Sequence, residues 1–555
     1  MPQPPGSLIV RKDLLAEGLL TATSPTQNRW WIGAPLLVVV ALYVLPLAGS
    51  PPATNPNEVA RIELAAALAT GACLDIESAA AVYGLSEDVA RRDGRIYSDK
   101  APGLSFLAAP ITLLVDWLRP SVPGTDLPAY WPLRHLLTFI LVALPTAGLA
   151  FLIAAFVPGQ DSRRRSSLAL ITALATPLWT YAIVFFGHAP AAVLVTIAWA
   201  LLLRPGVADG PPRRLCALAG GVAIGFAVTV EYPTVLLLGI IFAALVARRT
   251  PLPILSWAAV GAIVGLAPAL AYHQLAFGAP WLTGYAFKAQ TEFQAIHARG
   301  VFGVSMPSLE ALWGVLFGAR RGLFYFSPVL LLAPLGMWRM ARGSGSRDVG
   351  PLAAGIAVYM LFAAGFADWE AGWCAAARHL VPIVPLLAIP TLDALVNADS
   401  RWSWKVLAAG LIACSGVNAA LSIALTPFFP PQFDVPLAQL VLPSLADAAG
   451  LHNIISAAIG LPEIAVVIAI VVVTVATLGW ASSRILRMPR RWVAGVFAAT
   501  LAVQLLWLGW RGADATTEVE LMRAQVLQRL GYEALAERIE RESAVSLSRT
   551  PHDDK

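Results

Sequence analysis

Long apolar runs alternate with short polar segments along most of this chain. A helix that crosses a membrane needs about 20 apolar residues, because the hydrocarbon core of a bilayer is roughly 30 Å thick. About thirteen runs reach or approach this length, at roughly 31–49, 134–157, 167–187, 189–204, 215–231, 233–249, 252–276, 323–340, 350–366, 380–397, 404–425, 463–482 and 491–511. We therefore predict an all-α, polytopic membrane protein with about thirteen transmembrane helices.

A shorter apolar run, Leu104 to Leu118, either crosses the bilayer or lies along its surface. Short loops rich in Lys and Arg face the cytoplasm in most membrane proteins. If 104–118 does not cross, the short basic loops all fall on the same side as the N-terminus. They contain Arg163 to Arg165, Arg204, Arg213, Arg214, Arg248, Arg249, Arg339, Arg342, Arg347, Arg401, Lys405, Arg484, Arg487, Arg490 and Arg491. We therefore predict that 104–118 is an outward-facing juxtamembrane helix.

This topology divides the chain into three parts. Residues 1–30 form a cytoplasmic N-terminal segment, and residues 31–511 form the transmembrane domain. Residues 512–555 form an extracytoplasmic tail, in which Glu518 to Glu542 has the apolar spacing of an amphipathic helix. The outer loops of the transmembrane domain are then 50–133, 278–322, 367–379 and 426–462.

The composition agrees with a membrane protein and argues against several other classes of protein. Charged residues make up 13% of the chain, whereas soluble proteins carry about 25%. The net charge of +5 comes from basic loops that report topology, so nucleic acid is not an expected partner. The four cysteines lack metal-binding spacing. The chain has no Walker loop, no G-x-G-x-x-G beside a strand and no H-E-x-x-H motif, which argues against ATP hydrolysis, nicotinamide chemistry and zinc proteolysis.

The polar run YSDKAPG, Tyr97 to Gly103, directly precedes the 104–118 run. Asp99 and Lys100 set a carboxylate beside an ammonium at the predicted membrane surface. A solvated loop is one interpretation. The other is a binding site for a charged lipid headgroup, in which Asp99 orients Lys100 or acts as a base itself.

The segment after the first predicted span reads NPNEVARIEL from Asn55. Asn57 suits a helix N-cap, and Glu58 would follow in the first turn, where the helix dipole favours an anion. Glu58 and Arg61 are three positions apart and would share a helix face. They form either a weak surface ion pair or a general base oriented by an arginine. Asp88, in the same predicted outer loop, is a rival carboxylate.

Other polar residues stand at predicted outer borders of spans. Glu231 closes an apolar run, where an acidic residue is costly without a partner. His188 stands at the end of a span, where a histidine is either structural or part of a site. Trp369 and Arg378 lie in the outer segment 367–379, and the tryptophan either belongs to the interfacial aromatic belt or stacks on a sugar ring.

Two arginines depart from the rule that places basic residues inside. Arg320 and Arg321 precede an apolar run on the predicted outer side. Positive charge on that side favours an anionic partner such as a lipid phosphate.

Residues 30 to 400, taken together, resemble the GT-C superfamily of integral-membrane glycosyltransferases, which includes the protein O-mannosyltransferases and the lipid A aminoarabinose transferases. In the latter, an acidic residue three positions before an arginine opens the first outer loop, as Glu58 and Arg61 do here. They also carry a Tyr-x-Glu-Lys-Pro run whose lysine contacts the lipid phosphate. Tyr97, Asp99 and Lys100 match that run.

A group of bacterial membrane proteins with YSDKAPG, RGLF-YSP and GG-x-GPR-L-P runs is more similar still. The corresponding residues here are Tyr97 to Gly103, Arg321 to Pro328, and Ala371 to Trp373 with Arg378 to Pro382. Ala101 stands where the aminoarabinose transferases have proline.

The resemblance implies a hexosyl- or pentosyltransferase in the bacterial inner membrane. It would move a sugar from a polyprenyl-phosphate donor to a glycan, lipid or protein acceptor at the extracytoplasmic face. Glu58 is the first candidate for the base, with Asp99 and Asp88 as rivals, and a divalent cation is a candidate for holding the phosphate. The predicted substrate-binding residues are Arg61, Tyr97, Lys100, His188, Glu231, Arg320, Arg321, Trp369 and Arg378. A lipid or polysaccharide transporter and a non-catalytic scaffold for envelope synthesis stay open as alternatives.

Overall fold

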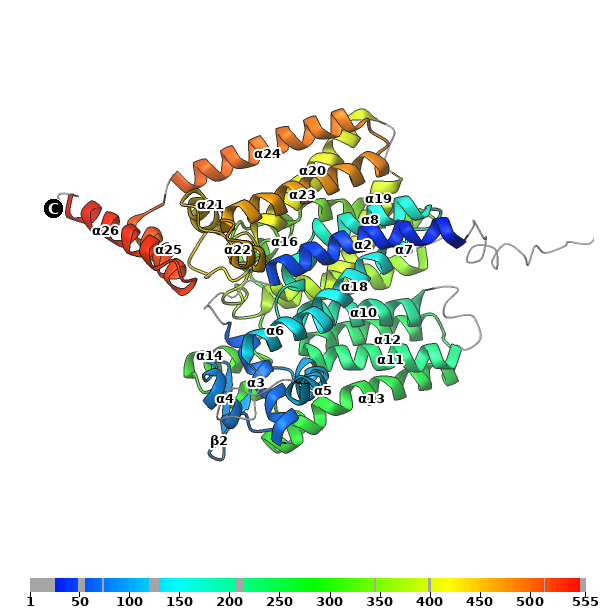
Figure 1. Ribbon diagram of the computed structural model, residues 1–555. Helices are drawn as coiled ribbons and strands as arrows, with labels where there is room; N and C mark the ends of the chain where they lie inside the picture. Colours follow the sequence, from blue (N-terminus) through cyan, green and yellow to red (C-terminus); the bar gives the residue numbers. More distant parts are fainter. Residues whose placement is uncertain are drawn as a thin grey trace, which may run out of the picture.

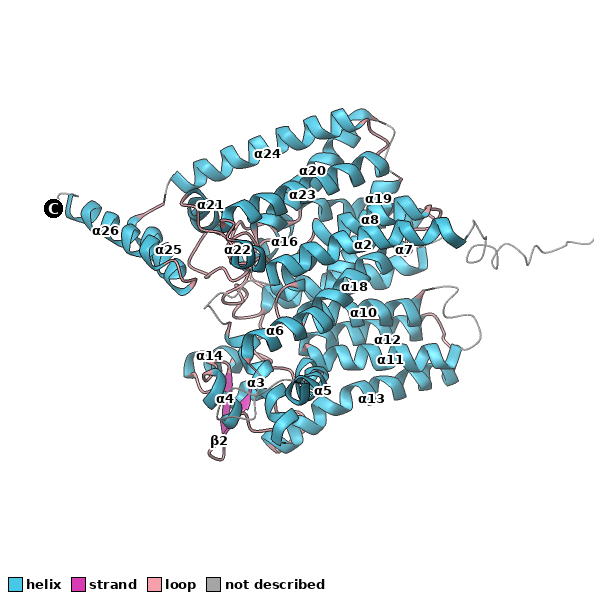
Figure 2. Ribbon diagram, viewed as in Figure 1, coloured by secondary structure: helices cyan, strands magenta, loops and turns pink. Residues whose placement is uncertain are grey.

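The computed structural model describes residues 25–47, 55–71, 74–118, 129–204, 213–343, 346–397, 401–513 and 515–549. Long helices run side by side through the molecule, and short helices and loops gather at one end (Figure 1). Figure 2 shows that the described chain is helical apart from one small hairpin. The hairpin pairs β1 (Val89–Arg92) with β2 (Arg95–Ser98) in antiparallel register.

Eight helices in the described residues are long and apolar enough to cross a membrane. They are the continuous helix α6 (Tyr130–Thr138), η1 (Phe139–Ala143) and α7 (Leu144–Ala155), then α11 (Arg213–Val230), α13 (Leu252–Phe277), α18 (Ser346–Gly365), η5 (Arg378–Ile383) with α19 (Val384–Val396), α20 (Trp402–Leu421), α23 (Glu463–Ile485) and α24 (Arg490–Ala513). The prediction of an all-helical, multi-pass membrane protein is confirmed, with the hairpin as its one departure in the described chain. The number of spans stays a prediction.

Shorter apolar helices accompany these spans. They lie in α2 (Pro25–Leu47), α5 (Gly103–Leu118), α10 (His188–Leu203), η2 (Tyr232–Thr234) with α12 (Val235–Ala247), and η6 (Leu437–Val441) with α21 (Leu442–Ala446). The remaining described helices are α3 (Pro56–Gly71), α4 (Glu77–Tyr83), α8 (Ser162–Leu174), α9 (Leu178–Ala182), η3 (Gly284–Phe287), α14 (Thr291–Ala298), α15 (Leu309–Leu316), α16 (Leu323–Phe326), η4 (Pro328–Leu332), α17 (Ala333–Arg342), α22 (Ile454–Ile459), α25 (Thr517–Arg529) and α26 (Glu533–Arg549).

Helices α11 and α13 pack closely because glycines line their contact. A Cβ atom at Gly221 or Gly225 would collide with the backbone of α13, and one at Gly261 or Gly265 would collide with that of α11. Small residues let membrane helices approach to this distance. Thr229 donates a hydrogen bond to the Gly265 carbonyl at 2.9 Å. This packing fixes the end of α11, which leads directly into the candidate site.

The basic loops gather at one end of the bundle. Arg164, near the start of α8, donates a hydrogen bond to the Ile485 carbonyl at the end of α23, with 3.3 Å between nitrogen and oxygen. Arg248, after α12, pairs with Asp348 near the start of α18 at 2.7 Å. These contacts join ends of helices that are far apart in sequence. The predicted grouping of the basic loops therefore agrees with the structure, and their cytoplasmic location stays a prediction.

Helix α5 begins at the end of the bundle opposite the basic loops, and the next described helix, α6, begins at that end too. A Cβ at Gly103 would lie 2.7 Å from the backbone of Thr229, near the end of α11. Where the described chain resumes, Tyr130 at the start of α6 contacts Tyr83 at the end of α4, with ring centres 5.5 Å apart. The chain thus enters and leaves the 104–118 region at the same end, as expected of a helix that does not cross.

The tail forms two helices where the sequence suggested one. Helices α25 and α26 are joined by a turn at Leu530 to Tyr532 and lie at the C-terminal end of the molecule (Figure 1). Arg523 and Arg538 both pair with Asp447, at 3.0 and 2.5 Å. The Tyr532 hydroxyl donates to the Gly450 carbonyl at 2.5 Å. The tail is therefore fixed to the segment that follows α21.

Candidate functional site

A cavity of about 1500 Å³ lies at the end of the bundle opposite the basic loops. Its walls come from α3, the loop before β1, the ends of α10 to α13, the segment after α13, the end of α18, the loop that follows it, and the end of α25. The acidic and basic residues that line it, histidines included, are Arg61, Glu87, Asp88, Lys100, His188, Glu231, His273, Lys288, His297, Asp368, Arg378, His379 and Arg529. Acids and bases from distant parts of the sequence thus meet around one space.

Helix α3 is capped by Asn55, two residues earlier than predicted. The Asn55 side-chain oxygen accepts the N–H of Asn57 at 3.0 Å, which satisfies one of the free donors at a helix start. Asn57 is instead inside the helix and accepts a hydrogen bond from Arg61 Nε at 3.0 Å. The prediction of Asn57 as the N-cap is wrong, because the helix starts at Pro56.

Glu58 points away from the cavity. Its carboxylate accepts hydrogen bonds from Arg134 Nη2 and from the Phe185 N–H, both at 2.7 Å. The side chain is buried and is not among the lining residues. The structure therefore places the first-choice base in an ion pair that joins α3 to α6.

Arg61 lies on the cavity wall and does not pair with Glu58, so the expected ion pair across one helix turn is absent. Its guanidinium donates to the Ala101 carbonyl at 2.9 Å and to Glu231 Oε1 at 2.8 Å. The same Glu231 oxygen lies 3.1 Å from His188 Nδ1. Burial opposes ionisation of Glu231, but His188 and Arg61 outweigh it and lower the pKa of Glu231 to about 2.

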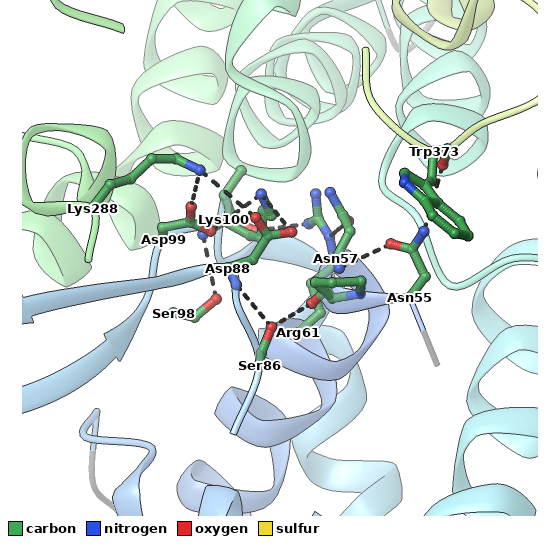
Figure 3. A network of polar contacts seen from close by, with 12 residues as sticks. Asn55, Asn57, Arg61, Ser86, Asp88, Ser98, Asp99, Lys100, Lys288 and Trp373 are labelled. Atoms are coloured by element: carbon green, nitrogen blue, oxygen red, sulfur yellow. Dashed lines mark hydrogen bonds and ion pairs between the residues drawn. The ribbon is translucent and has the colours of Figure 1, made fainter. Parts of the chain in front are cut away.

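Two lysines and two aspartates form the most highly charged part of the site (Figure 3). Lys100 Nζ lies 3.0 Å from Asp88 and 3.2 Å from Asp99. Lys288 Nζ lies 2.7 Å from Asp99 and 3.7 Å from Asp88. Asp99 is fully buried behind the two lysines, whereas Asp88, Lys100 and Lys288 line the cavity. No motif in the sequence marks Lys288 as a site residue.

The β-hairpin positions these four residues. Asp88 precedes β1, and Asp99 and Lys100 follow β2, so the antiparallel pairing brings them together. The chain around Lys288 continues this arrangement, because Ala289 donates its N–H to the Val89 carbonyl at 3.0 Å. Burial opposes ionisation of Asp88, but attraction to Lys100 and Lys288 outweighs it and lowers the pKa of Asp88. The cluster therefore favours the ionised form of Asp88.

Arg378 supplies a further cation to the cavity wall. Within the described ranges it makes no ion pair and no hydrogen bond, and its guanidinium carbon lies 5.9 Å from the centre of the Phe186 ring. Its charge interacts with those of Asp368 and Asp88 without direct contact. An arginine in this state keeps its donors available for an anion.

Arg320 and Arg321 do not line the cavity. Arg321 is fully buried and donates to the carbonyls of Glu370, Gly372 and Phe429 at 2.8, 2.9 and 3.0 Å. Arg320 pairs with the carboxylates of Glu370 and Asp434. Both arginines therefore hold the loop after α18 in place. The sequence had suggested instead that they contact a lipid phosphate.

Two predicted aromatic contacts with substrate are also absent from the cavity wall. Tyr97 is buried and contacts Phe277 edge to face, with ring centres 5.6 Å apart. Trp369 packs against Gly314 in α15, where any Cβ atom would collide with the indole. Trp373, four residues further on, does line the cavity, and Arg529 of the tail lies over its ring at 4.8 Å. No pattern in the sequence indicated that α25 would line the site.

One side of the cavity is apolar. Its residues come from the start of α12, the second half of α13 and the second half of α18, and they include Val235, Leu236, Leu266, Leu270, Val358 and Leu361. Val235 and Leu361 are each 50% exposed. The polar cluster therefore continues into an apolar wall formed by helices of the membrane domain.

No group of three or more metal-ligating side chains occurs in the described part of the chain. The divalent cation considered from the resemblance stays a prediction.

Comparison with models of known protein families gives no match, and neither does comparison with curated proteins. Among solved structures, 86% of this chain is similar to 76% of the crystal structure of ArnT from Cupriavidus metallidurans bound to undecaprenyl phosphate, at 17% identity and a TM-score of 0.49. For the apo structure of ArnT from the same organism, 82% of this chain is similar to 76% of that chain, at 18% identity and a TM-score of 0.44. A third similar structure is the archaeal oligosaccharyltransferase AglB from Archaeoglobus fulgidus, in complex with an inhibitory peptide and a dolichol-phosphate. Here 74% of this chain is similar to 57% of that chain, at 11% identity and a TM-score of 0.39.

ArnT is a GT-C lipid A aminoarabinose transferase, a member of the superfamily that the sequence motifs resemble.

Proposed function

We propose that this protein is a membrane glycosyltransferase that moves a sugar from a polyprenyl-phosphate donor to an acceptor at the extracytoplasmic face. The observation that carries this proposal is the continuity of a cationic cluster with an apolar wall inside one cavity. A polyprenyl phosphate has the same two parts, an anionic head and a long hydrocarbon tail. The bacterial inner membrane, the outer position of the site and the domain limits given above belong to the same proposal.

Lys100 and Lys288 are the proposed phosphate ligands. Each ammonium has three donors, and Asp88 and Asp99 hold both of them at the cavity wall. The aspartates also offset part of the cationic charge while the site is empty, and a phosphate entering between the lysines replaces water around them. Arg378, which has no ion pair within the described residues, adds a planar donor set suited to phosphate oxygens.

The same cations stabilise the leaving group. During transfer, the acceptor oxygen bonds to the anomeric carbon and the bond from that carbon to the phosphate oxygen breaks. The electron pair goes to the phosphate, so negative charge develops beside Lys100 and Lys288. Hydrogen-bond donors held beside the leaving phosphate lower the activation barrier of transfer, because they need not reorganise during the reaction. Asp88 and Asp99 are ion-paired with the lysines, and we assign them to positioning these cations.

Arg61, His188 and Glu231 form the adjoining part of the polar wall, since Arg61 donates to the carbonyl of Ala101, next to Lys100. Glu231 holds the arginine and the histidine together, at 2.8 and 3.1 Å. This fixed group suits the orientation of sugar hydroxyls, which need both donors and acceptors. Glu58 supports it from behind by joining α3 to α6.

The experiment is a binding and transfer assay with the full chain in nanodiscs. Undecaprenyl phosphate should bind, and a panel of polyprenyl-phosphate hexoses and pentoses, offered with envelope glycans, lipids and proteins, should contain a pair that supports transfer. Binding without transfer would favour the scaffold or transporter alternative. Absence of both would contradict the proposal.

A further inference from the structure

The carboxylates that line the cavity differ in whether a cation already holds them. Asp88 is paired with the two lysines, and Glu231 is paired with Arg61 and His188. The other two lining carboxylates, Glu87 and Asp368, make no ion pair and accept no side-chain hydrogen bond within the described ranges. Glu87 is exposed, whereas Asp368 is half-buried.

This difference matters because transfer to a hydroxyl needs a group that takes up a proton. A general base works best when its pKa lies near the operating pH. Cations lower the pKa of Asp88, and they lower that of Glu231 to about 2. Protonation of either carboxylate would also break the ion pairs that hold Lys100 or Arg61 in place. Both are therefore better suited to holding cations than to accepting a proton.

The loop that carries Asp368 is rigidly held. Arg321 donates to the carbonyls of Glu370 and Gly372, and the Asp368 carbonyl accepts the N–H of Ala371 at 3.0 Å. Ala371 has φ of 63°, a left-handed conformation that is unfavourable for a residue with a side chain and persists only where its surroundings enforce it. A catalytic group must be held close to one geometry to be effective.

Asp368 lines the cavity from the loop between α18 and η5. Its charge acts on Arg378, and Arg378 in turn acts on Asp88 in the lysine cluster. Lys100 lines the same cavity from the segment after β2, and Lys288 lines it from the segment after η3. A sugar joined to a phosphate at the two lysines would therefore meet Asp368 from a different segment than its leaving group.

We propose that Asp368 is the general base of the transfer reaction, an inference that rests on the function proposed above. The Asp368 carboxylate takes the proton from the acceptor hydroxyl as the acceptor oxygen bonds to the anomeric carbon. The bond between that carbon and the donor phosphate breaks, and the phosphate leaves with the electron pair. The products are the glycosylated acceptor, polyprenyl phosphate and a protonated Asp368, which loses its proton to water.

The test measures transfer by the full chain with the donor and acceptor found in the assay above. Asp368→Asn should lower kcat by at least about 100-fold, the usual scale of general acid–base catalysis, with affinity for undecaprenyl phosphate changed by less than about threefold. Glu87→Gln removes the other unpaired carboxylate of the wall and should leave kcat within about twofold. Formate, a small external base, should raise the kcat of Asp368→Ala at least about tenfold.

Three results would overturn the inference while leaving the proposed function intact. These are wild-type kcat in Asp368→Asn, a large loss of undecaprenyl phosphate affinity in that variant, and no recovery of Asp368→Ala with formate. If Asp368→Asn does not fold, Asp368→Ala with and without formate decides. Absence of transfer by the wild-type chain with every donor would instead overturn both the function and this inference.

Discussion

Two sets of charged residues lie at the same end of the bundle, and they differ in what surrounds them. Lys100 and Lys288 stand on the cavity wall between two aspartates. Glu58 and Arg321 lie behind that wall, with every contact made to other parts of the protein. All four are buried or nearly so. Burial alone therefore does not separate a binding residue from a structural one.

What separates the two sets is access to the cavity. A charge behind the wall serves stability, because its removal strands a buried partner. A charge on the wall serves binding as well, because a ligand can take the place of water beside it. Replacing residues of the first set should therefore change stability most, and replacing residues of the second set should change ligand affinity most.

The largest effect is expected for Glu58→Gln. This variant leaves Arg134 as a buried charge without its partner, which costs about 3–5 kcal/mol. Thermal unfolding of the purified chain should show a large loss of stability, while the kcat of the protein that stays folded is retained. Full stability together with lost turnover would instead make Glu58 the base, as the sequence first suggested.

Arg321→Met should come next. The substitution leaves the carbonyls of Glu370, Gly372 and Phe429 without their donor, and an unsatisfied buried polar group costs about 1–3 kcal/mol. Unfolding should shift clearly to lower temperature. Arg320→Met is the matched control, because its half-exposed ion pairs contribute about 0–1 kcal/mol. Equal losses in the two variants would contradict the assignment.

Lys100→Met should have its main effect on the ligand. Loss of a hydrogen bond to a charged group costs about 1.5–3 kcal/mol, so affinity for undecaprenyl phosphate should fall at least about tenfold. Stability should fall less than in Arg321→Met, because Lys288 stays beside both aspartates. Lys288→Met should behave in the same way. Titration of the lipid phosphate in nanodiscs measures both, and an unchanged Kd in either variant would remove that lysine from the site.

The last effect, which is absent near neutral pH, is a dependence of stability on acid pH. The folded pKa of Glu231 is about 2, below its ordinary value of 4.5. Such a group contributes stability that is fully present above about pH 4.5 and is lost as the pH falls toward 2. Unfolding followed across this range should show a loss that Glu231→Gln lacks. An identical pH dependence in both proteins would mean that another carboxylate is responsible.

Sequence patterns predicted the parts of this molecule that depend on local order. Apolar runs predicted the helices. The order of charges around 104–118 predicted that the chain enters and leaves this region at the same end of the bundle. The YSDKAPG run predicted that Lys100 is a site residue, and Lys100 lies on the cavity wall. That it binds a phosphate stays a proposal.

Contacts between distant segments were not predictable in the same way. Lys288 reaches Asp99 from a segment with no recognisable motif, so only the folded chain brings them together. The spacing predicted Arg61 as a local partner of Glu58, but each of the two pairs with a residue far along the chain. Arg321 was predicted to bind an anion. Its actual partners are three backbone carbonyls, and a sequence does not show such contacts.

The most direct measurement is an experimental structure of the full chain in nanodiscs with undecaprenyl phosphate. We predict density for the phosphate within hydrogen-bonding distance of the Nζ atoms of both Lys100 and Lys288, with the hydrocarbon chain along the apolar wall of α12, α13 and α18. Density for the phosphate beside Arg320, or at any place away from the two lysines, would contradict the account.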